Sequence, residues 1–204
     1  MPQEHIITSI KRLDRQIFTT REIAFLRGTS LSSATQTLNG LAKSGVLLKI
    51  CRGTWGLEFG KEKISQYTLI QFLPPAGRVY LSFTSALHLY GIIEQIPRII
   101  TVATRAHSTT IRTSLGTYRL HSICRELFDG FDWYKGKGGF LIASPEKALI
   151  DCIYIAGRKG NAFASFPELH LDDFNVREAQ RWIDRIPNAR LKNRARNAFE
   201  SLIK

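Results

Sequence analysis

The first part of the chain spaces its apolar residues at the period of an α-helix. Three such stretches follow one another, at residues 3–13, 18–28 and 30–45. Each places an apolar residue every three or four positions, which is the spacing of an amphipathic helix. Thr19 or Thr20 is suited to cap the second stretch, and Gly28 is suited to end it. The pattern predicts three consecutive helices.

The third of these helices, which begins at Ser30 or Leu31, is expected to bury one face and expose the other. On a helical wheel the apolar face holds Leu31, Ala34, Leu38, Leu41 and Ala42. The opposite face holds short polar residues and one lysine, namely Ser32, Ser33, Gln36, Asn39 and Lys43. Because the period separates the two classes so clearly, the helix is expected to present a polar face to solvent.

Two short alternating segments follow, at residues 46–50 and 54–59, and they are joined by a turn at Cys51, Arg52 and Gly53. Such segments around a glycine turn predict a β-hairpin. The hairpin is basic, because Lys49 lies close to the Arg52 tip. Three helices followed by a basic hairpin is the element order of a winged helix-turn-helix, and we assign it to residues 1–63.

A recognition helix needs polar side chains that can approach base edges and phosphates. Gln36 and Asn39 are suited to pair with adenine, and Arg52 on the wing is suited to reach phosphates. The residues expected to contact DNA are Ser32, Ser33, Gln36, Asn39, Lys43, Lys49 and Arg52. Two alternatives remain at this point: an ordinary solvated helix face, and a winged helix that docks another protein.

Residues 64–204 contain both predicted helices and predicted strands. Helices are expected at residues 67–73, 82–91, 144–157, 176–186 and 189–203. Strands are expected at residues 98–104, 109–114, 116–123, 131–134 and 139–143. Pro74 and Pro75 end the first helix, and Ser82 or Thr84 caps the second. The predicted fold class is therefore α+β: an N-terminal winged helix-turn-helix followed by a mixed α/β domain with a mainly antiparallel sheet and C-terminal helices.

The stretch "LIASPEKALID" crowds two acids and a lysine beside an apolar run. Ser144 is a good N-cap, Pro145 suits the first helical position, and Glu146 lies where the helix dipole favours an anion. Lys147 and Asp151 are four residues apart and are expected to pair in solvent. A nuclease would need further carboxylates for Mg²⁺, and the preceding "GFLIA" offers none. We interpret the stretch as a helix start without catalytic residues.

Composition narrows the class of partner. The formal net charge is +12 and the isoelectric point is about 10.0, which favours a polyanion such as double-stranded DNA. The three cysteines are odd in number and lie far apart, so a disulfide framework is not expected. Unpaired cysteines are typical of a reducing compartment, so a cytoplasmic location is expected. No membrane segment, cofactor or metal site is expected, and the histidines lack a ligand pattern.

The last helix carries a cluster of positive charge, formed by Arg190, Lys192, Arg194 and Arg196. A solvated face and an auxiliary surface for a partner or for nucleic acid explain such a cluster equally well.

A winged helix followed by "YLSFTSALHLYGIIEQIPRIITVAT", "GTYRLHSI" and "ASPEKALIDCIY" resembles the AbiEi family of antitoxins from bacterial type IV toxin–antitoxin systems. The resemblance covers almost the whole chain. It implies an N-terminal domain that binds operator DNA and represses its own operon. It also implies a C-terminal domain without enzymatic activity that counters a nucleotidyltransferase-like toxin, with direct contact left open.

Two other functions fit the same residues. One is a nucleic-acid enzyme, such as a nuclease targeted by its winged helix. The other is an orphan transcriptional regulator of the same architecture.

Overall fold

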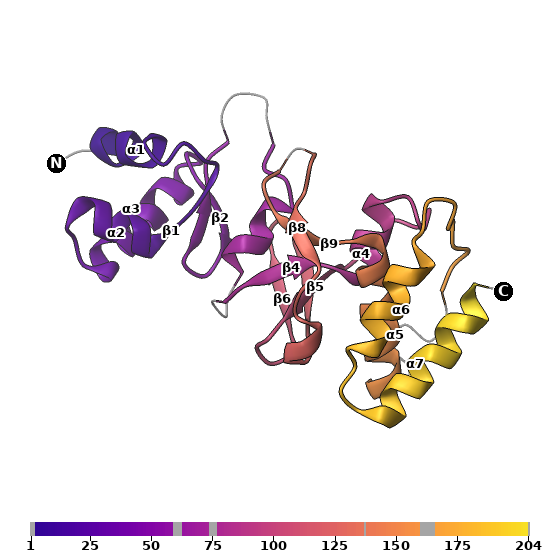
Figure 1. Ribbon diagram of the computed structural model, residues 1–204. Helices are drawn as coiled ribbons and strands as arrows, with labels where there is room; N and C mark the ends of the chain where they lie inside the picture. The colour runs from indigo at the N-terminus through magenta and orange to yellow at the C-terminus, as the bar shows by residue number, and fades with distance from the viewer. Residues whose placement is uncertain (1–2, 59–62, 74–76, 137, 160–165, 204) are drawn as a thin grey trace. The chain divides into compact units, whose positions relative to one another are not determined.

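Figure 1 shows the computed structural model of the chain. The structure describes residues 3–58, 63–73, 77–136, 138–159 and 166–203. Phe59, Pro74 and Pro75, which the sequence suggested as element ends, lie outside these ranges. The chain divides into two compact units: residues 1–74 with 112–116, and residues 75–111 with 117–204. The α+β fold class is confirmed, while the predicted domain boundary between residues 63 and 64 stays a prediction.

The N-terminal unit has the elements of a winged helix. They are α1 (Gln3–Lys11), β1 (Ile17–Thr19), α2 (Thr20–Arg27), α3 (Leu31–Lys43), β2 (Leu48–Cys51), β3 (Thr54–Gly56) and the 3-10 helix η1 (Thr68–Phe72). The strands form an antiparallel sheet in the order β1-β3-β2. The sequence analysis did not predict β1, because residues 18 and 19 fit the helical spacing of the second stretch. Pairing with β3 makes it a strand.

Local caps set the bounds of α2 and α3. Thr19 and Glu22 form a capping box, in which the backbone N–H of Thr19 donates to Glu22 Oε2 (2.8 Å) and the N–H of Glu22 donates to Thr19 Oγ1 (3.3 Å). Gly28 closes α2 in the left-handed conformation, with φ of 59°. Ser30 then caps α3 by accepting a hydrogen bond from the N–H of Ser33 (3.1 Å). The predicted caps Thr19 and Ser30 and the Gly28 stop are confirmed, whereas residues 18 and 19, which were predicted within the second helical stretch, belong to β1.

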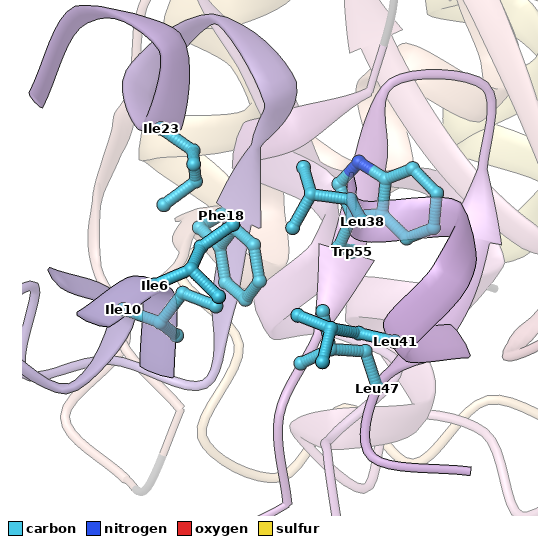
Figure 2. Packing of buried hydrophobic residues seen from close by; sticks show 8 residues of the cluster. All are labelled: Ile6, Ile10, Phe18, Ile23, Leu38, Leu41, Leu47 and Trp55. Atoms are coloured by element: carbon cyan, nitrogen blue, oxygen red, sulfur yellow. The ribbon is translucent and has the colours of Figure 1, made fainter. Parts of the chain in front are cut away.

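A cluster of buried apolar side chains lies at the centre of this unit (Figure 2). It consists of Ile6, Ile10, Phe18, Ile23, Leu38, Leu41, Leu47 and Trp55. Trp55 brings the wing into the cluster, and its indole N–H donates to Thr20 Oγ1 (2.8 Å). The prediction that Leu31 joins the buried face is wrong, because 52% of Leu31 is exposed. A helical wheel treats all positions of a face alike, whereas burial of this face begins at Ala34.

The C-terminal unit is built on a six-stranded sheet in the order β6-β7-β5-β4-β9-β8, from which only residues 112–116, around the β6–β7 connection, group with the N-terminal unit. Its strands are β4 (Val79–Leu81), β5 (Ile100–Thr104), β6 (Thr109–Thr113), β7 (Gly116–Ser122), β8 (Phe131–Trp133) and β9 (Leu141–Ala143). β4 pairs antiparallel with β5 and parallel with β9, β5 pairs parallel with β7, and β8 pairs antiparallel with β9. The short β6–β7 connection makes that pair a hairpin. β4 was missed, since its three residues are all apolar and show no alternation.

Helices α4 (Phe83–Leu89), α5 (Pro145–Lys159), α6 (Val176–Asp184) and α7 (Ala189–Leu202) complete this unit, with the 3-10 turn η2 (Arg125–Leu127). α5 packs against α4, α6, α7 and β9. It is therefore enclosed on several sides, and even its polar side chains at Lys147 and Asp151 are buried. The C-terminal helices agree with the prediction.

Candidate nucleic-acid interface and a buried ion pair

The exposed side of α3 forms a shallow depression. It is lined by Leu31, Ser32, Thr35, Gln36, Asn39, Gly40 and Lys43. The predicted residues Ser32, Gln36, Asn39 and Lys43 are thus brought together on one surface. Ser33 is exposed but does not line it. Because α3 contains no acidic residue, nothing on the helix itself would repel a phosphate backbone.

A second depression runs between α3 and the wing. Its lining is Thr20, Leu31, Thr35, Lys49, Ile50, Cys51, Arg52, Gly53 and Trp55. Leu31 and Thr35 line both depressions, so the two surfaces are continuous. We call this continuous surface the recognition face. It joins the polar residues of the helix to the cations Lys49 and Arg52 of the wing.

The recognition face contains Thr35, which the sequence analysis did not include. Its hydroxyl donates to the carbonyl of Leu31 (2.6 Å), one helical turn earlier. The residue lies three positions after Ser32 and four before Asn39. Helical spacing alone would therefore have placed it on the same face.

The structure also joins two predicted DNA-contacting residues to each other. Lys49 Nζ lies 3.0 Å from Asn39 Oδ1 and donates to it. The same ammonium lies 5.4 Å from the centre of the Trp55 ring. Asn39 and Lys49 belong to different elements, α3 and β2, so no periodicity within one element predicts this contact.

The "SPEKALID" stretch forms a different kind of site. Lys147 Nζ donates to Asp151 Oδ1, and both side chains are completely buried. The prediction that this pair lies in solvent is wrong. The spacing of four residues was correct, but the polar face of α5 turned out to be covered. Helical periodicity identifies which residues share a face and not which neighbours cover it.

Strand β4 and the residue after it supply the remaining partners of this pair. Ser82 Oγ donates to Asp151 Oδ2 (2.7 Å), and Tyr80 Oη donates to the same oxygen (3.2 Å). Tyr80 Oη also accepts from Lys147 Nζ (3.1 Å). Ser82 stands at the N-cap position of α4, yet its side chain makes no capping hydrogen bond. Its predicted capping role is wrong, because the hydroxyl bonds to Asp151 instead.

Aromatic rings surround the buried ammonium. Lys147 Nζ lies 5.4 Å from the centre of the Trp182 ring and 5.6 Å from that of Tyr80. Burial is the main influence on both charged groups: it lowers the pKa of Lys147 and raises the pKa of Asp151, and each charge partly offsets the shift of the other. With no exposed atom, this network holds α5 against β4 and gives a substrate no access.

The start of α5 follows the prediction. Ser144 Oγ accepts from the N–H of Lys147 (3.2 Å), which confirms the predicted cap. Glu146 does more than face the helix dipole, because its Oε1 accepts from the N–H of Asn175 (3.1 Å). Asn175 is itself the N-cap of α6. Glu146 therefore ties the beginnings of two helices together.

The basic cluster of α7 divides into two pairs. Arg196 forms an ion pair with Asp184 (2.8 Å), and Arg194 donates to the carbonyl of Gly157 (3.5 Å). Arg190 and Lys192 form no ion pair within the described part of the chain. Arg194 and Arg196 thus have structural contacts, while the side chains of Arg190 and Lys192 are not engaged in ion pairs among the described residues.

Among the residues that the structure describes, no three or more His, Cys, Asp or Glu side chains gather as a metal site would require. The expectation that the chain is not an enzyme stays a prediction. The three cysteines are free thiols. No helix in the described ranges has both the length and the apolar character needed to cross a bilayer.

Three helices, a basic wing and a continuous polar recognition face define a winged-helix DNA-binding domain. Residues 3–73 match the family model described as Firmicute plasmid replication protein (RepL). The match lies in the N-terminal unit and supports a DNA-binding regulator. A comparison with curated proteins gave no match.

Proposed function

We propose that the protein is a transcriptional repressor that binds operator DNA at its own promoter and acts as the antitoxin of a type IV toxin–antitoxin system. The observation that carries the proposal is the recognition face, where Gln36 and Asn39 of α3 adjoin the cations of the wing. Polar side chains at the centre suit base edges, and Arg52 and Lys43 suit the flanking phosphates.

The antitoxin part of the proposal rests on the resemblance to the AbiEi family. The two segments with the strongest resemblance, "LSFTSALHLYGI" and "SPEKALID", meet in the buried network: Ser82 comes from the first, and Lys147 and Asp151 come from the second. The shared motifs therefore serve to hold the C-terminal fold together. This supports a role in which that unit presents a surface, rather than one in which these residues catalyse a reaction.

The proposed partners are double-stranded operator DNA and, for the C-terminal unit, a functional link to a nucleotidyltransferase-like toxin. Arg190 and Lys192 are the best candidates for a contact with a partner, because their side chains are not occupied by ion pairs within the described residues. In this proposal the protein acts in the cytoplasm, without a cofactor and without enzymatic activity.

The DNA-binding part is tested by gel-shift titration with the duplex upstream of the protein's own gene, with a shuffled duplex of equal length as control. We expect tighter binding to the upstream duplex and repression of a reporter fused to it. Equal affinity for both duplexes would contradict operator recognition.

The antitoxin part is tested by co-expression with the product of the adjacent open reading frame. Rescue of growth is expected. The glutamate variants Arg190→Glu and Lys192→Glu should weaken rescue without altering operator affinity. Growth arrest that persists in the presence of the wild-type chain would contradict an antitoxin role.

The nuclease alternative is tested by incubating duplex DNA and RNA with the protein and Mg²⁺ or Mn²⁺. If the protein is a repressor without enzymatic activity, both substrates should remain intact. Metal-dependent cleavage of either substrate would favour the enzyme.

The match to the RepL family model favours a second candidate, in which the same recognition face binds a plasmid origin. A plasmid that carries the bound duplex and lacks its own initiator would then replicate only when the protein is supplied. Failure to replicate, together with promoter repression, would favour the repressor.

A further inference from the structure

The contact between Lys49 and Asn39 fixes the orientation of the Asn39 amide. An ammonium group has three donors and no acceptor, so the amide atom 3.0 Å from Lys49 Nζ must be the oxygen. The Nδ2 amino group of Asn39 therefore points away from Lys49. Asn39 lines the depression of α3, and Lys49 lines the adjoining one.

Lys49 is itself held in place. Its ammonium lies over the Trp55 ring at 5.4 Å. Trp55 is 1% exposed, and its indole N–H is bonded to Thr20 Oγ1 at 2.8 Å. The lysine thus rests on a ring that is fixed by the core of the unit. This support lowers the cost of ordering a long side chain before DNA binds.

The pair presents mainly donors. Asn39 Nδ2 and the remaining N–H groups of Lys49 all donate, whereas one of the two lone pairs of Asn39 Oδ1 is engaged by the Lys49 ammonium. In the major groove guanine presents two acceptors, N7 and O6, whereas adenine presents the N7 acceptor and the N6 amino donor. An adenine N6 amino group that approached the remaining lone pair of Oδ1 would meet the positive ammonium of Lys49 beside it, which disfavours a second donor there.

We propose that Asn39 and Lys49 together form a two-donor reader that selects guanine, with Lys49 as the positioning residue for the Asn39 amide. The proposal rests on the function proposed above and deepens it by naming the base. It replaces the expectation, based on asparagine alone, that Asn39 pairs with adenine.

The proposal predicts a switch of specificity. In Lys49→Met the side chain keeps an apolar stem for Trp55 but loses the donor to Oδ1. The Asn39 amide then has both a donor and an acceptor free, which is the pattern that pairs with adenine N6 and N7. The preferred base at one position of the site should change from guanine to adenine, with discrimination on the order of tenfold in each direction.

The experiment selects bound duplexes from a random library with the full chain and sequences them. Wild type, Lys49→Met, Lys49→Arg and Asn39→Ala are compared. Lys49→Arg retains a donor and should keep guanine, whereas Asn39→Ala should lose preference at that position. Lys43→Met is the matched control, since it removes one cation from the same face without touching Asn39. It should bind more weakly and keep guanine.

Substitution of 7-deazaguanine at the selected position checks the contact directly, because it removes the N7 acceptor. Wild-type affinity should fall on the order of tenfold, and Asn39→Ala affinity should change little. Melting curves establish that each variant is folded.

The outcomes separate the two proposals. If no duplex is enriched, the proposed DNA-binding function fails, and the guanine reader fails with it. If a motif is enriched but lacks guanine, or if Lys49→Met keeps guanine, DNA recognition stands and the two-donor reader is overturned.

Discussion

Two lysines show how one side chain serves opposite purposes in the two units of this protein. Lys49 and Lys147 each donate to a side-chain oxygen, and each lies over an aromatic ring. Lys49 is exposed on the wing beside Asn39. Lys147 is completely buried beside Asp151. Lys49 retains N–H donors that can bind a ligand, whereas the N–H donors of Lys147 bond to groups within the fold.

The difference in solvent access also changes the energetics. An exposed contact between Lys49 and Asn39 contributes little to stability, because water competes for both groups. The buried pair has lost its hydration, so each charge depends on the other and on the hydroxyls of Tyr80 and Ser82. Substitutions should therefore affect binding at Lys49 and folding at Lys147.

The largest effect is expected from Asp151→Asn. This near-isosteric change removes the charge that compensates Lys147 within an enclosed site. Breaking a buried pair in this way typically costs about 3–5 kcal/mol in the free energy of unfolding. Denaturant unfolding measures the loss, and gel-shift titration should give nearly wild-type operator affinity wherever the protein remains folded.

The double variant Lys147→Met with Asp151→Leu is the control for this prediction. It removes both charges and keeps apolar volume, so it should be far more stable than either single variant. A double variant as unstable as Asp151→Asn would show that cavity or packing defects, rather than an uncompensated charge, cause the loss.

The recognition face should respond in binding rather than in stability. Gln36→Ala removes a side chain suited to base edges, so specific binding should weaken by about 1–3 kcal/mol and random DNA should be affected less. Arg52→Ala should weaken binding to all sequences and reduce the slope of log binding constant against log salt concentration by about one. Gel-shift titrations at several salt concentrations distinguish the effect of Gln36→Ala from that of Arg52→Ala. Ser33→Ala, off the lined surface, should have a smaller effect than Gln36→Ala.

If Gln36→Ala weakened specific and random binding equally, base contact by Gln36 would be ruled out. An unchanged salt slope in Arg52→Ala would remove the wing tip from the phosphate contacts.

A smaller effect is expected at the start of α5. Ser144→Ala removes the acceptor of the Lys147 N–H and should cost roughly 0.5–2 kcal/mol of unfolding free energy. Glu146→Gln keeps an oxygen for Asn175 and weakens only the interaction with the helix dipole, so about 0.3–1 kcal/mol is expected. Thermal melting compares them. Loss of toxin rescue in Glu146→Gln at unchanged stability would show that this residue has a role beyond structure.

The smallest effect concerns pH and the capping box of α2. Burial tends to raise the pKa of Glu22, but hydrogen bonds from Thr19 and Arg15 outweigh it and leave the pKa below its ordinary value of 4.5. The stabilisation is therefore present above pH 4.5 and is lost as pH falls through the lowered folded-state pKa. Glu22→Gln should flatten this acid limb in melting measurements. An unchanged acid limb would remove Glu22 as its source.

Much of the molecule follows from short-range patterns in the sequence. The caps at Thr19, Ser30 and Ser144, and the Gly28 stop, depend on groups within a few residues of one another. Such interactions are readable because the spacing along the chain fixes the geometry. The same reasoning located the exposed polar face of α3.

The strands β1 and β4 were beyond that reasoning. Neither alternates apolar with polar residues, and each is defined by hydrogen bonds to a strand distant in sequence. The role of Ser82 was missed for a related reason. Its position before α4 suits a cap, but Asp151, 69 residues away, takes the hydroxyl.

The sequence by itself determined the order of the helices, the caps at Thr19, Ser30 and Ser144, the basic character of the chain and the polar side of the recognition helix, since each depends on composition or on neighbours within a turn or two. Only the tertiary structure decided that Lys147 and Asp151 are buried and that Lys49 engages Asn39. Both facts depend on which surfaces pack together, and residues distant along the chain supply those surfaces.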